Sequence, residues 1–128
     1  AGFSSPAVPF SGNCLAFSAD GSLAAVCVTR RGEQQVLVYR LSHVAGGELA
    51  EARLVKTIPS SGGSLAFSPD SSLLAVLNLH LSLWSLEDGR LLAQIPGALP
   101  YGSLFFFPGG DLLAAVSADG RILIYGAP

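Results

Sequence analysis

The chain has 128 residues, of which 50% are hydrophobic and 12% are charged, and its formal net charge at pH 7 is −2. The mean hydropathy of +0.52 predicts that most of the side-chain surface is buried against the chain itself or against partners. The seven basic residues are scattered along the chain, which excludes the basic stripe that nucleic-acid binding requires.

Three segments align when the sequence is slid along itself. They are Cys14–Leu23 (CLAFSADGSL), Ser64–Leu73 (SLAFSPDSSL) and Ser103–Leu112 (SLFFFPGGDL). Their starts are 50 and 39 residues apart. These spacings are close to the roughly 40–45 residues of a four-stranded repeat unit.

Each repeat holds further apolar runs, separated by residues that favour tight turns. The second runs are 23–28, 73–77 and 112–116, and the third runs are 36–41, 81–86 and 122–125. Asp and Gly between the runs tolerate the backbone of a reversal, so each unit is predicted to be built of antiparallel hairpins. In the second copy the leucines alternate evenly from Leu77 to Leu83, so one long strand is an alternative. We favour the hairpin because the other two copies have one at this place.

A fourth run closes the unit, at Arg53–Ile58 and Leu91–Ile95, and Pro follows each of them. Val8-Pro9 repeats this ending, so Phe3–Val8 is predicted to be the fourth strand of a preceding unit. The sequence therefore predicts an all-β protein with about three four-stranded antiparallel blades of a β-propeller, whose ring is incomplete within this chain. The expected divisions are 1–11 (last strand of a preceding blade), 12–60 (first blade), 61–99 (second blade) and 100–128 (third blade without its last strand).

Two segments resemble the WD-repeat family. Leu83-Trp84-Ser85-Leu86 and the following Glu-Asp-Gly-Arg are similar to that family's third strand, its Trp-Asp ending and the next turn. Ser117–Gly126 resembles the segment with the family's turn Asp, and Tyr125 stands at the position of the Trp. The resemblance covers nearly the whole chain, from Val8 to Gly126. It implies structural roles for Asp20, Asp70, Trp84, Asp119 and Tyr125.

The chain departs from the family at two places. The Gly-His before the first strand is missing from every copy, and Ser85, Arg40 or Gly126 replaces the Asp of the Trp-Asp pair. The family's buried Asp–His–Ser–Trp hydrogen-bond chain is therefore expected to be incomplete in every blade. The resemblance implies a non-catalytic scaffold that binds proteins of a larger complex.

Three blades do not close a ring, because propellers have roughly 4–8 of them. An open array would expose apolar blade faces and strand edges. The remaining blades of the same propeller, or a second copy of the chain, are therefore expected partners. We expect the first of these, with the chain a fragment of a larger protein.

Two predicted insertions carry candidate partner-binding residues. Arg30-Arg31-Gly32-Glu33 is interpreted as an enlarged loop before the third strand of the first blade, where Arg could bind carboxylates or phosphates. Ser42–Ala52 lies on the opposite rim and contains His43, Glu48 and Glu51. His80, at a predicted turn near Trp84, is a further candidate. A solvated surface role is the alternative for each of these residues.

No catalytic residues, cofactor or metal site are predicted, because the sequence lacks a nucleophile elbow, a phosphate loop and a metal-binding His pair. The uncharged stretch Leu91–Gly110 is too rich in Pro and Gly for a membrane helix. Phosphoinositide binding through Arg30 and Arg31, small-ligand binding, and a non-catalytic part of a propeller enzyme remain alternatives to the scaffold.

Cys14 and Cys27 are predicted to lie opposite each other across the first hairpin. A disulfide between them is the alternative to two packed free thiols, which we favour. Free thiols fit a cytoplasmic protein, with nuclear or ciliary locations also open.

Overall fold

The computed structural model describes residues 14–43, 49–60, 63–78, 80–96, 103–116 and 120–126. The predicted strand Phe3–Val8 and the candidates Glu48 and Asp119 lie outside these ranges. Within them the chain forms three antiparallel sheets. The first contains β1 (Cys14–Phe17), β2 (Leu23–Arg30), β3 (Glu33–His43) and β4 (Leu49–Ile58); the second contains β5 (Ser64–Phe67), β6 (Leu73–Leu77), β7 (His80–Ser85) and β8 (Leu91–Pro96); the third contains β9 (Ser103–Phe106), β10 (Leu112–Val116) and β11 (Ile122–Gly126).

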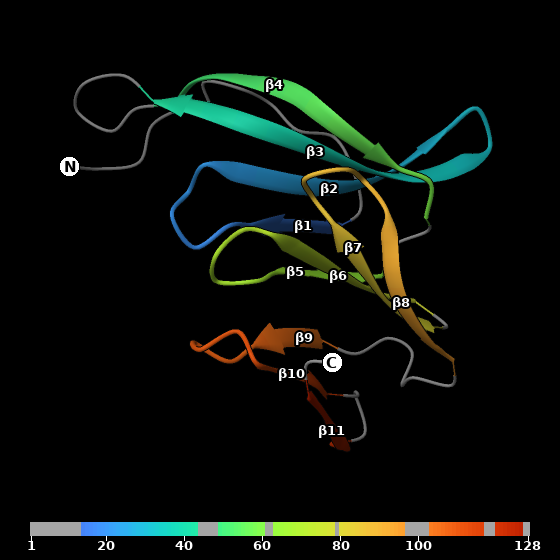
Figure 1. Cartoon of the computed structure of the whole chain (residues 1–128). Helices are drawn as coiled ribbons and strands as arrows, with labels where there is room; N and C mark the ends of the chain where they lie inside the picture. The colour runs from blue at the N-terminus through green and yellow to red at the C-terminus, as the bar shows by residue number, and fades with distance from the viewer. Residues whose placement is uncertain are drawn as a thin grey trace.

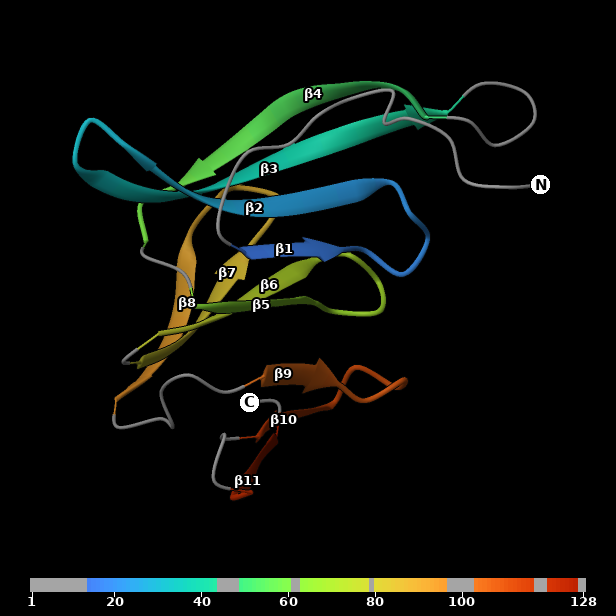
Figure 2. The same ribbon diagram turned by 180° about the vertical axis from the view of Figure 1, so that it is seen from behind.

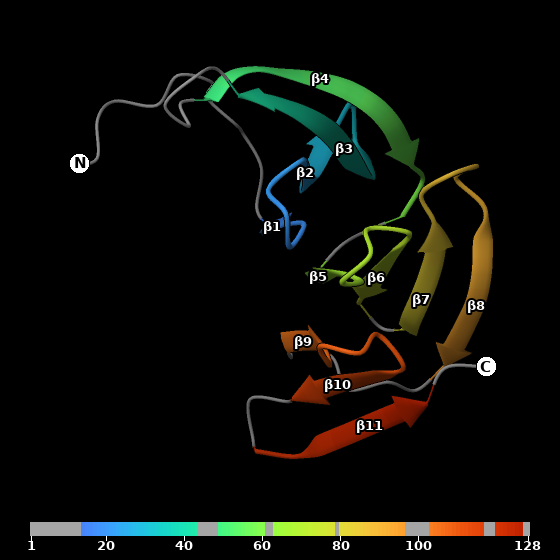
Figure 3. The same cartoon turned by 60° about the vertical axis from the view of Figure 1, so that its left-hand side comes forward.

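The sheets are arranged radially, like blades (Figure 3). The first strands of the three sheets lie innermost, with β1 against β5 and β5 against β9, and Figures 1 and 2 show them side by side from opposite directions. The later strands of each sheet extend outward from this centre. The prediction of an all-β, incomplete propeller is confirmed, because the described residues form three antiparallel sheets that do not close a ring of blades.

Two hydrophobic cores lie between the blades. The first joins Val36, Val38 and Ile58 of the first sheet to Leu74 and Val76 of the second. The second joins the opposite face of the middle sheet to Leu104, Leu113 and Ala115 of the third. The middle strands are therefore covered on both faces, which explains why β6 is a continuous apolar run rather than an alternating one.

The hairpins follow the registers expected from the repeats. Cys14 pairs with Cys27, as predicted. Leu77 pairs with Leu81 across β6 and β7, so the alternating leucines form a hairpin and not one long strand. His80 lies at the start of β7 rather than in a turn, and its backbone N–H donates to Oδ1 of Asn78 at 2.8 Å.

The prediction of an enlarged loop at Arg30–Glu33 is wrong. Arg30 ends β2 and Glu33 begins β3, and the two residues pair across a turn made only of Arg31 and Gly32. Both turn residues have positive φ, 52° and 80°. A turn with this backbone matches the twist of the flanking strands, so the hairpin stays paired up to the turn. The residues that the first blade has in addition to the second therefore lengthen β2 and β3 and do not form a loop.

The second insertion likewise lengthens a hairpin. β3 continues through His43 and β4 begins at Leu49, so much of the predicted Ser42–Ala52 insertion is strand. Ser42 pairs with Glu51 and His43 with Leu49, after a register shift between Ser42 and His43. The β3–β4 hairpin therefore extends beyond the neighbouring blade (Figure 1). No helix long and apolar enough to cross a membrane occurs in the described part of the chain.

Candidate protein-interaction surfaces

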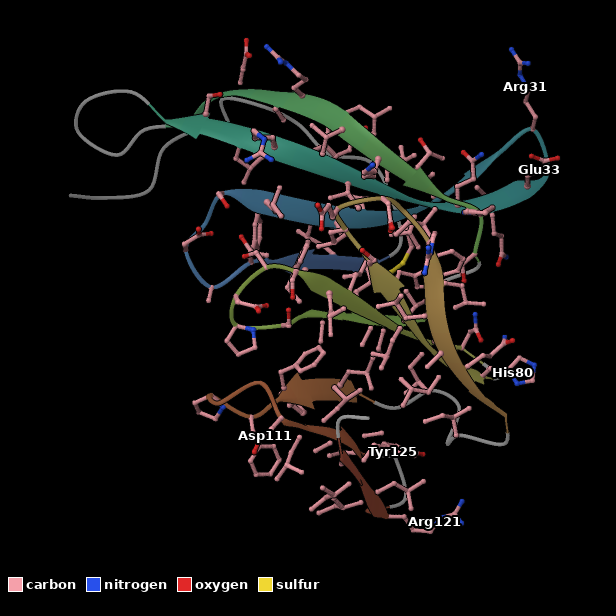
Figure 4. The ribbon with its side chains drawn as sticks, viewed as in Figure 1. Arg31, Glu33, His80, Asp111, Arg121 and Tyr125 are labelled. Atoms are coloured by element: carbon pink, nitrogen blue, oxygen red, sulfur yellow. A yellow bond between two sulfur atoms is a disulfide. The ribbon has the colours of Figure 1, made fainter. Side chains whose placement is uncertain are left out.

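One rim of the array collects polar side chains from the turns between the second and third strands of the blades. Arg31 lies in the β2–β3 turn, Glu33 begins β3, His80 begins β7 and Arg121 directly precedes β11, and all four are on the same side of the molecule (Figure 4). All four side chains are exposed. The structure thus brings three predicted partner-binding residues to one rim. Sequence reasoning missed Arg121, although the Asp-Gly turn signal before it marks this position.

Arg31 and Glu33 place both signs of charge at the tip of the β2–β3 hairpin. Arg30 pairs with Glu33 in the ladder. The tip is therefore a mixed polar surface and not the cluster of cations that a polyanionic headgroup would favour.

The other predicted residues belong to the opposite rim. His43 ends β3, and Glu51 lies exposed on β4. The predicted candidates are therefore divided between two rims and do not form one site. In the described ranges no group of three or more His, Cys, Asp or Glu side chains could hold a metal ion.

Asp20 and Asp70 organise the turns between the first and second strands. Oδ1 of Asp20 accepts hydrogen bonds from the backbone N–H and the hydroxyl of Ser22, at 3.0 and 2.7 Å, and from the hydroxyl of Ser18 at 2.9 Å. The bond from the Ser22 N–H is the largest cause that lowers the pKa of Asp20 to about 2. Asp70 repeats the arrangement, and its pKa is also lowered to about 2, chiefly by the hydroxyl of Ser72. The two carboxylates therefore stabilise turns.

Trp84 is anchored within its blade. Its indole N–H donates to the hydroxyl of Ser82 at 3.1 Å, and this hydroxyl donates to the carbonyl of Val76 at 3.3 Å. The Trp ring also packs against the first core. Tyr125, at the equivalent position of the third blade, packs against the second core. Both aromatic residues thus connect a third strand to a neighbouring blade.

Cys14 and Cys27 form a disulfide between β1 and β2, with a Cα–Cα distance of 5.0 Å. The interpretation as two free thiols is therefore wrong, because the register that places the two residues opposite each other also brings their sulfur atoms together. The expectation of a reducing compartment depended on free thiols, and the disulfide removes that support.

A crevice lies between the first two blades, with a volume of about 360 Å³. Arg40 and Lys56 of the first blade line one wall, and Leu86 and Glu87 of the second blade line the other. A second crevice, between the second and third blades, has a volume of about 200 Å³. Sequence reasoning identified neither crevice, because each is formed only where two sheets meet.

No family model and no curated protein matches the sequence. Among solved structures, the chain is similar to the β-propeller domain of Cps50 (Swd1) from Myceliophteria thermophila, with a TM-score of 0.72 and 20% sequence identity. The match covers 89% of this chain and 39% of that domain, so the chain spans well under half of the propeller that it resembles. At this identity the similarity shows that the fold is that of a β-propeller.

Proposed function

We propose that this chain is part of a non-catalytic propeller scaffold that binds other proteins within a larger assembly. The observation that carries this proposal is the rim formed by Arg31, Glu33, His80 and Arg121, which three successive blades contribute to one exposed, mixed-charge surface. A mixed polar surface of this kind suits protein partners, because complementary charges steer binding and fix its orientation.

The innermost strands favour the scaffold over an enzyme or ligand receptor. Such a protein would gather polar side chains at the centre of the array, as binding pockets require. Instead, the residues of β1, β5 and β9, the innermost strands, are almost all apolar. Ser64 and Ser103 are the only polar residues of β1, β5 and β9.

The third blade supports the proposal that further blades belong to the assembly. Ile122 and Ile124 of β11 are 62% and 59% exposed. They correspond to Val36 and Val38 of β3, which the second blade covers and which are 0% and 1% exposed. A further blade, from the same propeller or from a second copy of the chain, would bury the two isoleucines in the same way.

The rim can be tested by crosslinking in cells, followed by quantitative mass spectrometry of the proteins attached to the tagged protein. Arg31→Glu and Arg121→Glu should each reduce the recovery of a shared set of partners. Asp111→Lys, an exposed control on the turn between β9 and β10, should retain that set. Equal recovery with all three variants would contradict the proposed rim.

A further inference from the structure

The two crevices occupy equivalent positions in consecutive pairs of blades. Comparing their lining residues therefore shows which features of the first crevice the fold itself does not require. Leu23 and Val38 line the first crevice, and their counterparts Leu73 and Leu83 line the second. Lys56 pairs with Val38 as Ala93 pairs with Leu83. Where the first crevice has an ammonium group, the second therefore has a methyl group. The fold does not require a cation at this position.

Arg40 shows the same contrast. It pairs with Leu23 in the first blade, and the small residue Ser85 pairs with Leu73 in the second. Direct cross-strand partners lie on one face of a sheet, so Arg40 is on the same face of the first sheet as Leu23, and both residues line the crevice. Arg40 and Lys56 of the first blade thus stand where the second blade has the small residues Ser85 and Ala93. Both cations line the larger of the two crevices.

A third cation lies beside them without a compensating carboxylate. Arg53 pairs directly with Arg40, and like charges in this position destabilise a sheet. The corresponding residue beyond the bulge of the second blade is Arg90, whose Nε lies 3.8 Å from Oδ2 of Asp88. In the part of the chain that the structure describes, neither Arg40 nor Arg53 forms a salt bridge. The unbalanced positive charge beside the crevice is therefore available to an anion.

The opposite wall restricts what that anion can be. On this wall Leu86 offers apolar surface and Glu87 adds one negative charge, and Val55 of the first blade extends the apolar surface on the near side. The side chain of Lys56 passes the turn that contains Gly89, whose added Cβ would lie 3.8 Å from the Cδ of Lys56. A single carboxylate between Arg40 and Lys56 would be compensated, whereas Glu87 would repel a dense polyanion such as a nucleic acid. The apolar surface suits a neighbouring aliphatic side chain.

We propose that this crevice binds an acidic, leucine-containing segment of a partner protein, with a carboxylate held by Arg40 and Lys56 and an aliphatic side chain against Val55 and Leu86. The inference deepens the proposed scaffold function and depends on it for the class of partner. The crevice is separate from the rim of Arg31 and Arg121. A failure of the crevice proposal can therefore be distinguished from a failure of the scaffold proposal.

The test is fluorescence anisotropy with the full chain and a labelled peptide, Gly-Ser-Leu-Glu-Leu-Glu-Ser-Gly. The variant Arg40→Ser with Lys56→Ala copies the residues that the second blade already has, so it should keep the fold; circular dichroism checks this. It should weaken peptide binding about tenfold or more, as the loss of hydrogen bonds between charged groups predicts. Arg40→Gln with Lys56→Gln, which removes both charges but keeps polar side chains, should have the same effect.

Two controls separate the crevice from general charge effects. Arg31→Gln and Arg121→Gln each remove a cation from the rim, and both variants should bind the peptide with unchanged affinity. A peptide with Gln in place of Glu should bind weakly to every variant. Binding of the acidic peptide should also weaken as salt is added.

Equal binding of the Glu and Gln peptides, or wild-type affinity in both crevice variants, would overturn the proposal. Tighter binding of oligouridine than of the peptide, lost in the same variants, would overturn it in favour of a nucleic-acid site. Any of these results would leave the dependence of partner recovery on Arg31 and Arg121 unchanged. That dependence tests the scaffold proposal independently.

Discussion

The hydroxyl of Ser68 donates to Oδ1 of Asp70 at 2.7 Å and accepts the backbone N–H of Leu73 at 2.9 Å. Ser18 makes the same pair of contacts with Asp20 and Leu23 in the first blade. Each serine is buried, with 3% of Ser68 and 4% of Ser18 exposed. One hydroxyl thus connects the end of the first strand, the turn and the start of the second strand.

Ser68→Ala should therefore destabilise the chain by roughly 1–3 kcal/mol, because the N–H of Leu73 would lose its side-chain acceptor. Urea unfolding followed by circular dichroism measures this change. Ser42→Ala, at an exposed position on β3, is the control and should change stability by less than about 0.5 kcal/mol. Equal stability of the two variants would show that the Ser68 hydroxyl has no such role.

The turn aspartates predict an acid dependence of folding. The pKa of Asp20 and that of Asp70 are each lowered from 3.8 to about 2, so the folded state favours the charged forms. Their contribution to stability is complete above the unfolded value and is lost as the pH falls from about 4 to about 2. Urea midpoints measured across this range should therefore decrease. The double variant Asp20→Asn with Asp70→Asn should be less stable at neutral pH and show a smaller decrease; an unchanged pH profile would contradict this assignment.

The sequence was sufficient to predict the features that depend on local turn chemistry. The Asp20 and Asp70 turns set the registers of the first hairpins, and the repeat then places the third strands. The short Arg31-Gly32 turn was not predicted. The first blade has more residues than the second between these two strands, and the additional residues were interpreted as a longer loop. Gly after a polar residue, in the middle of a long strand pattern, is the signal that could have identified it.

The features that depend on contact between sheets could not be predicted from the sequence. Arg40 and Lys56 are far from Glu87 in the chain, and they line one crevice only because two blades pack side by side. The bulge between Val38 and Tyr39 also changes the register of β4. It brings Arg53 opposite Arg40, a pairing that simple alternation along the strand would not indicate.

The hydrogen bond from Trp84 to Ser82 predicts a spectroscopic effect. Trp84 is the only tryptophan in the chain, so its fluorescence reports on this site. Ser82→Ala removes the acceptor of the indole N–H and should destabilise the chain by about 1 kcal/mol. It should also shift the emission maximum of the folded protein, whereas Ser42→Ala should not. An unchanged spectrum would show that the Ser82 hydroxyl does not hold the indole.

The disulfide predicts that Cys14 and Cys27 are protected from alkylation until a reductant is added. Mass spectrometry of the purified chain, treated with iodoacetamide before and after reduction, measures this protection. The reduced chain should be less stable by roughly 3 kcal/mol, the value expected for a closed loop of about 15 residues. The same treatment can be applied to protein from cells lysed in acid, which preserves the state of the thiols in the cell. Full alkylation of both cysteines without reductant would contradict the disulfide and favour a reducing compartment.

Ile58 and Ile124 distinguish a blade face that is covered from one that is open. Ile58 is 0% exposed in the core between the first two blades, so Ile58→Ala should cost roughly 2–5 kcal/mol in urea unfolding. Ile124 is 59% exposed on the outer face of the third blade, so Ile124→Ala should cost less than about 0.5 kcal/mol in the same chain.

The cost of Ile124→Ala should increase to the range of Ile58→Ala wherever a further blade packs on β11, because the same methyl groups would then leave a cavity. Measuring both variants in the 128-residue chain and in a longer polypeptide that contains it tests this directly. Ile58→Ala is the internal control, since its core is complete in both. An equally small effect of Ile124→Ala in both proteins would show that no blade covers this face.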